Sequence, residues 1–173
     1  MSLTQESHRN PQDPDSAYDL APAERFIVWS FRRWVLGLNE NNGGHWSMVW
    51  NEFAKEMGAQ DGKAALSDFA SLIRCLQLYA RRKVYHHQPC CPCLGADEIW
   101  MFCLVSACQN QRPQLARSLA EWMVEPDGAA EIIKAATGVA QMMGRHALNL
   151  PVRTGAMPAG TDAGNASVPA RVH

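Results

Sequence analysis

Apolar side chains recur every three or four positions along most of the chain, which is the spacing of one helix face. No stretch alternates apolar and polar residues in the two-residue period of a half-buried strand. The pattern therefore predicts an all-α fold, a compact bundle of about six helices. They are expected near residues 22–38, 45–57, 61–83, 95–110, 113–123 and 129–148.

Helix start and stop signals divide the pattern. Pro22 suits the first position of a helix, and the Asn-Asn-Gly-Gly run at 41–44 ends that helix. Gly58 can cap the end of the second helix, and Asp61 can cap the start of the third. The sequence therefore predicts two separate helices on either side of residues 58–61.

The segment at about 96–110 differs from the others because it is apolar nearly all round. Helices of this kind are surrounded by other helices, so we expect it at the centre of the bundle. Asp97 and Glu98 stand in its first turn, where carboxylates favour the exposed N–H groups. The apolar residues are Ile99, Trp100, Phe102, Cys103, Leu104 and Val105.

Both ends of the chain have the composition of disordered tails. Residues 152–173 are dominated by Gly, Ala, Pro, Ser and Thr, so burial would not compensate the entropy lost on ordering them. We expect a helical domain over 22–150, with disordered tails over 1–21 and 151–173.

Composition gives no global electrostatic signal. The 173 residues carry a formal net charge of -1, with 47% hydrophobic and 19% charged residues. The N-terminal residues lack the apolar run of a secretory signal, and the longest apolar stretch, residues 99–108, is too short to span a bilayer. These observations predict a cytoplasmic protein without a membrane span.

Residues 86–93, the Cys/His loop, concentrate chemistry-bearing side chains. The loop contains a Cys-x-x-Cys pair, Cys90 and Cys93, preceded by His86 and His87. Thiolate and imidazole are the ligands that zinc prefers, and a tetrahedral site needs four of them. These four residues are the candidate zinc ligands, and the competing interpretation is a loop of reduced thiols.

A redox role is the second interpretation of this loop. Cys90 and Cys93 have the spacing of a disulfide-forming pair, and Cys93 precedes a helix N-terminus that would favour its thiolate. The other cysteines, Cys75, Cys103 and Cys108, fall on apolar helix positions and are read as small core residues.

Two surface features suggest a binding function. Arg81, Arg82 and Lys83 form the most basic run, and a structural explanation also exists, because cations stabilise the last turn of a helix. Trp29 lies beside Arg25, Arg32 and Arg33 on a helix face that we expect to be exposed. It is expected either to anchor a partner or to stack on an arginine of the same chain.

No catalytic motif is present: the chain lacks a phosphate-binding glycine loop, a nucleophile elbow and a His-Glu-x-x-His helix. The sequence favours a non-enzymatic cytoplasmic regulatory or adaptor protein that binds a protein partner near the Cys/His loop. The alternative is a DNA-binding regulator that uses the basic run together with Arg112 and Arg117 of a helical hairpin at 106–123. Neither the partner nor the oligomeric state follows from the sequence.

Overall fold

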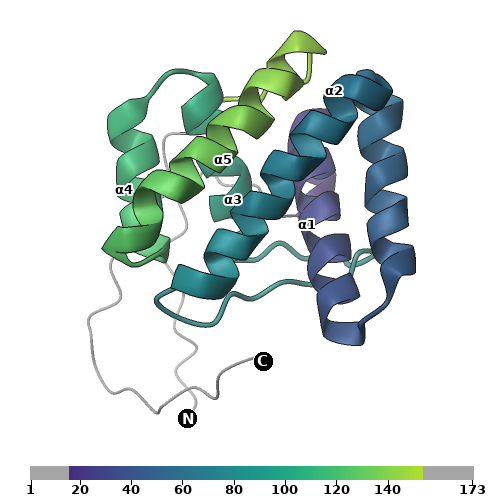
Figure 1. Cartoon of the computed structure of the whole chain (residues 1–173), viewed down its shortest axis with the longest axis horizontal. Helices are drawn as coiled ribbons and strands as arrows, with labels where there is room; N and C mark the ends of the chain where they lie inside the picture. Colours follow the sequence, from purple (N-terminus) through teal and green to yellow (C-terminus); the bar gives the residue numbers. More distant parts are fainter. Residues whose placement is uncertain (1–15, 154–173) are drawn as a thin grey trace.

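The computed structural model describes residues 16–153, which fold into five α-helices and one short 3-10 helix (Figure 1). The predicted all-α class is confirmed, because no strand occurs in this part of the chain. The elements are η1 (Ala17–Asp19), α1 (Pro22–Glu40), α2 (Gly43–Tyr79), α3 (Ala96–Gln109), α4 (Pro113–Met123) and α5 (Pro126–Arg145).

The prediction of about six helices is wrong by one, since the second and third expected helices form the single element α2. A break does occur at Gly58, whose φ of 74° and ψ of 167° are non-helical. Because Gly58 turns the chain within one residue, helical structure resumes at once, without the linker expected over 58–61. The two parts of α2 then pack together, and their Phe53 and Phe69 rings lie 5.6 Å apart between centroids.

Helix α3 occupies the centre of the bundle, as its apolar pattern predicts. Every residue from Trp100 to Ala107 is buried, and α1, α4 and α5 all pack against this helix. The indole N–H of Trp100 donates to the carbonyl of Leu119 at 2.8 Å, so its one polar atom is satisfied in the interior.

Helix α5 runs alongside the second part of α2 (Figure 1). A glycine allows the close approach at the start of α5. A Cβ on Gly128 would stand 2.6 Å from the Cβ of Tyr79, closer than side chains tolerate. The packing of α5 on α2 therefore requires the absence of a side chain at residue 128.

The two ends of the described chain are fastened to the bundle. Leu20 is buried, and the backbone N–H of Ala17 donates to the carbonyl of Pro92. At the other end, Arg153 makes a bidentate ion pair with buried Glu24 at 2.5 and 2.7 Å. The remaining residues of the predicted tails, 1–15 and 154–173, lie outside the described residues.

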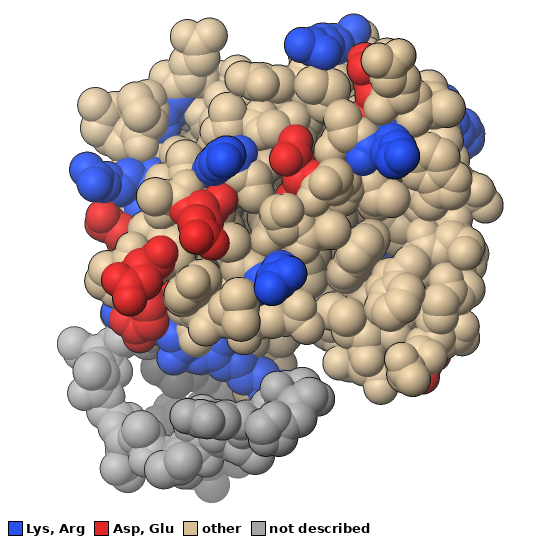
Figure 2. Space-filling model, viewed as in Figure 1, with Lys and Arg blue, Asp and Glu red and all other residues tan. Residues whose placement is uncertain are grey.

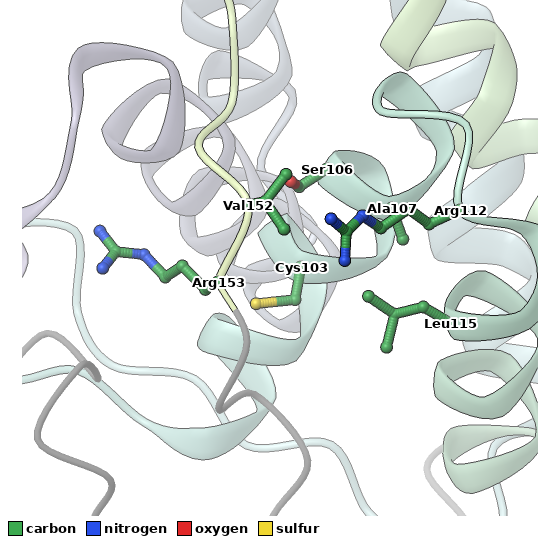
Figure 3. A pocket seen from close by; sticks show the side chains of 7 residues that line it. All are labelled: Cys103, Ser106, Ala107, Arg112, Leu115, Val152 and Arg153. Carbon is green, nitrogen blue, oxygen red and sulfur yellow. The ribbon is translucent and has the colours of Figure 1, made fainter.

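A small pocket lies where the C-terminal segment passes α3. Figure 3 shows Val152 and Arg153 of this segment near Cys103 and Ser106 of α3, with Arg112 on the other side. The hydroxyl of Ser106 donates to the carbonyl of Pro151 at 2.8 Å, which holds the segment in place. The pocket volume of about 10 Å³ is enough for one water molecule only, so we assign no ligand to it.

Basic and acidic side chains are interspersed on the face drawn in Figure 2. That face presents no broad surface of one charge, as the near-zero net charge of the chain implies. Within residues 16–153, no helix combines the length and apolar character that a membrane span requires.

Candidate binding site at the Cys/His loop

The Cys/His loop is held by one buried side chain from α1, Arg32, which is 2% exposed. All five guanidinium N–H groups have partners. Two donate to the carboxylate of Glu98 at 2.7 and 2.9 Å. The other three donate to the carbonyls of Gln88, Cys91 and Cys93 at 3.3, 2.7 and 2.6 Å. Arg32 therefore fixes the backbone of the loop at three points.

Glu98, in the first turn of α3, supplies the opposite charge. Its carboxylate is fully buried and also accepts the backbone N–H groups of His87 and Gly95, each at 2.8 Å. Burial favours the neutral acid, but the hydrogen bonds from Arg32, His87 and Gly95 outweigh it and lower the pKa of Glu98 to about 2. The pair is therefore ionised at neutral pH.

Sequence reasoning missed this pair, because it placed Arg32 on an exposed face with Trp29. A signal was present. Arg32 lies four residues after the apolar Val28, so the two side chains lie on the same side of the helix. An arginine on the apolar side of a helix requires a buried acid as its partner. Glu98, on the nearly all-apolar helix, was the available acid.

A second ion pair joins the basic run to the same helix. Arg82 donates to both carboxylate oxygens of buried Asp97 at 3.0 and 2.6 Å, and its guanidinium lies 4.6 Å from the centre of the Trp122 ring. The backbone N–H of Tyr85 also donates to Asp97 at 2.7 Å. These contacts connect the entrance of the Cys/His loop to α3 and α4.

The predicted structural role of the basic run at the end of its own helix is wrong, because α2 ends at Tyr79. Arg81 instead serves the end of α4, where its side chain donates to the carbonyls of Glu121 and Val124 at 3.0 and 2.9 Å. The ammonium of Lys83 lies 5.6 Å from the Tyr85 ring centre. Internal contacts therefore account for Arg81 and Arg82 as well as for Lys83.

The two candidate histidine ligands face different partners. The Nδ1 of His87 contacts a carboxylate oxygen of Glu98 at 2.9 Å, whereas the Nε2 of His86 lies 3.4 Å from the side-chain amide of Asn39. Cys90 and Cys93 are both exposed. Among the residues that the structure describes, no three His, Cys, Asp or Glu side chains are grouped as a metal ion requires. The four candidate zinc ligands therefore do not form such a group in this part of the chain.

The loop brings together a different pair of thiols, Cys91 and Cys93. The backbone N–H of Cys93 donates to the sulfur of Cys91 at 3.4 Å. A hydrogen bond with Cys91 also raises the pKa of the Cys93 thiol. The Cys-x-x-Cys spacing predicted a pairing of Cys90 with Cys93, and it did not predict the contact of Cys93 with Cys91.

An open pocket of about 180 Å³ lies between the Cys/His loop, α1 and η1, and we call it the loop pocket. Its exposed wall is mostly apolar. Tyr18, at its edge, is 77% exposed. The residues that line the pocket are Ala17, Tyr18, Leu20, Arg25, Val28, Trp29, Arg32, Pro89, Cys90, Cys91 and Pro92.

Trp29 is the one predicted partner-binding residue that lies in this pocket. It is partly buried, and the guanidinium of Arg33 lies 5.6 Å from its ring centre, as the stacking alternative predicts. Arg25, on the turn before, is exposed and has no ion pair with any residue of 16–153. The loop pocket therefore combines an aromatic wall with a cationic rim.

The helical hairpin of the DNA-binding alternative does exist, with α3 and α4 joined at residues 110–112. Its first helix is the buried centre of the bundle, and α4 buries Ala116, Leu119 and Met123 against it. Arg117 on the exposed face of α4 pairs with Glu121 at 3.2 Å. Packing therefore explains the hairpin, and the exposed face carries charges of both signs.

Comparison of the chain with protein-family models, with characterised proteins and with solved structures gives no match.

Proposed function

We propose that this protein is a non-enzymatic regulatory or adaptor protein that binds a protein partner through the loop pocket. The occupant is a segment that inserts one apolar side chain and places an Asp or Glu beside it. The observation that carries this proposal is the aromatic and proline wall, held rigid by Arg32, with Arg25 at its rim.

The volume of the pocket supports a single side chain as the occupant. A cavity of about 150 Å³ accommodates a benzene ring, whereas pockets for small-molecule ligands run from about 300 to 1,000 Å³. At about 180 Å³ the loop pocket matches one aromatic or aliphatic side chain. It is small for a cofactor, and the proposal includes neither a cofactor nor zinc.

The charge at the rim of the loop pocket supports an Asp or Glu next to the inserted side chain. Arg32 lines the pocket but is neutralised by Glu98, so it offers no net charge to a ligand. Arg25 is exposed and without an ion pair among the described residues, so it is available to a carboxylate. Trp and Arg are also the residue types most enriched among interface hot spots.

Selection of peptides from a displayed random library on the full chain tests the proposal. We expect enrichment of segments with an apolar residue next to Asp or Glu. Titration calorimetry with a selected peptide should show that Trp29→Ala weakens binding by about tenfold or more, as loss of a hot spot does. Arg25→Glu should weaken it too, because the charge at the rim is reversed.

Arg117→Glu is the matched control, since it makes the same charge change on the exposed face of α4 and should leave the affinity unchanged. Selected peptides without an acidic preference would overturn the proposal. Equal affinity for the wild type and Trp29→Ala would overturn it as well. Because Arg25 is exposed, Arg25→Glu keeps the test decisive even where Trp29→Ala fails to fold.

A further inference from the structure

We propose that Cys91 and Cys93 form a dithiol site that reacts with small-molecule disulfides and closes into an intramolecular disulfide. The inference does not depend on which partner fills the loop pocket. It rests on the contact between the two cysteines, the clamp that holds them and their access to solvent.

The first observation is that the loop is shaped to bring the two thiols together. The Cys93 N–H reaches the Cys91 sulfur across Pro92 at 3.4 Å. Arg32 binds the carbonyls on both sides of this turn, those of Cys91 and Cys93, at 2.7 and 2.6 Å. The approach of the two cysteines is therefore fixed by a buried charge pair.

The second observation is the difference in environment among the six cysteines. Cys93 is exposed and Cys91 partly so. By contrast, burial and the neighbouring Glu131 raise the pKa of the Cys75 thiol, and burial raises the pKa of the Cys108 thiol. A small disulfide in solution reaches exposed thiols more readily than buried ones, so the thiols open to reaction are those of the loop.

The order of reaction follows from position. Cys91 lines the loop pocket, whereas Cys93 does not. Cys91 is therefore the attacking cysteine, and Cys93 resolves the mixed disulfide.

The reaction balances as two thiol–disulfide exchanges. The Cys91 thiolate attacks one sulfur of the small disulfide, the S–S bond breaks, and the first small thiol leaves with a proton. The Cys93 thiol then loses its proton to water, and its sulfur attacks the Cys91 sulfur of the mixed disulfide. This step forms the Cys91–Cys93 bond and releases the second small thiol. The two cysteines lose two electrons, and the small disulfide gains them.

Incubation of the full reduced chain with glutathione disulfide tests the site. Alkylation and peptide mapping should find a Cys91–Cys93 disulfide, with two glutathione thiols released per chain and no glutathione retained. The Cys93→Ser variant should stop at the mixed disulfide and retain one glutathione on Cys91. The Cys91→Ser variant should form no disulfide within the loop.

Cys90→Ser is the matched control, because Cys90 is exposed in the same loop and adjoins Cys91. This variant should close the Cys91–Cys93 disulfide at the wild-type rate. A disulfide that includes Cys90 would overturn the proposal. A wild-type chain that stays reduced, or that ends as a stable mixed disulfide, would overturn it equally.

Discussion

Arg32 and Glu98 determine the conformation of a loop that is otherwise rich in prolines and exposed cysteines. Every donor of Arg32 is used, and three of the five bind the loop backbone. A buried ion pair contributes little net stability when compared with an apolar pair, but removing one partner leaves an uncompensated charge in the interior. The pair therefore fixes one loop conformation, and each member depends on the other.

The Glu98 carboxylate should make stability depend on pH. Its pKa of about 2 lies below the usual 4.5. Between these two pH values the folded state therefore binds fewer protons than the unfolded state. The stabilisation is complete above about pH 5 and is lost as the pH falls toward 2, by about 3 kcal/mol. Urea unfolding of the wild type at a series of pH values measures this loss.

In Glu98→Gln we expect this acid-dependent loss to disappear and stability at pH 7 to fall by roughly 3–5 kcal/mol, because Arg32 keeps a buried charge without its partner. Glu121→Gln, at an exposed and paired position, serves as the control and should preserve the wild-type profile. A Glu98→Gln variant whose stability still declines between pH 5 and 2 by the wild-type amount would assign the loss to other carboxylates.

The sequence located this site only in part, and the reason lies in the residues concerned. The Cys/His loop and Trp29 were recognisable by residue type, and they do lie together at one pocket. The role of Arg32 was not recognisable in this way, because a charged side chain is expected on a solvent-exposed face. The sequence also could not predict that Cys91 contacts Cys93. Arg32 binds the carbonyls of both cysteines, and it lies about 60 residues before them, so the spacing within the loop does not reveal this contact.

At the scale of elements, the helix periodicity predicted where each helix lies, whereas the break in α2 was predicted only as a gap. Apolar spacing reports which face is buried, and both parts of α2 bury such a face: Phe53 in the first part and Phe69 in the second. Spacing does not report how a chain turns between two helices. Gly58 makes the turn with a backbone conformation that belongs almost entirely to glycine.

Gly58→Ala should therefore destabilise the fold by about 1–3 kcal/mol, the cost of forcing a Cβ into this region. A Cβ there would meet no other atom within 4 Å, so the cost is conformational and not steric crowding by neighbours. Gly43→Ala is the control, because residue 43 also has open space but no positive φ, and its effect should stay within about 0.5 kcal/mol. Chemical unfolding of both variants makes the comparison, and equal stabilities would contradict the observed turn at Gly58.

At the scale of the whole molecule, the Arg153–Glu24 ion pair closes the bundle between residues 129 positions apart. Glu24 is fully buried at the start of α1, and Arg153 also lies 5.9 Å from the centre of the Phe102 ring on α3. The C-terminal segment therefore links the first helix to the central one. The domain predicted from composition, 22–150, ends three residues before this contact.

A chain that ends at residue 150 should consequently be less stable than one that ends at residue 153, since Glu24 keeps its charge in the interior without Arg153. We expect a loss of roughly 3–5 kcal/mol, and Arg153→Met in the full chain should reproduce most of it. Urea unfolding of the two shortened chains and of the full-length variants Arg153→Met, Glu24→Gln and the double variant tests this expectation. The double variant should lose less than the sum of the single losses, because each single change strands the same partner. Additive losses would show that Glu24 and Arg153 do not depend on each other. Equal stability of the two shortened chains would show that residues 151–153 add nothing to the stability of the bundle.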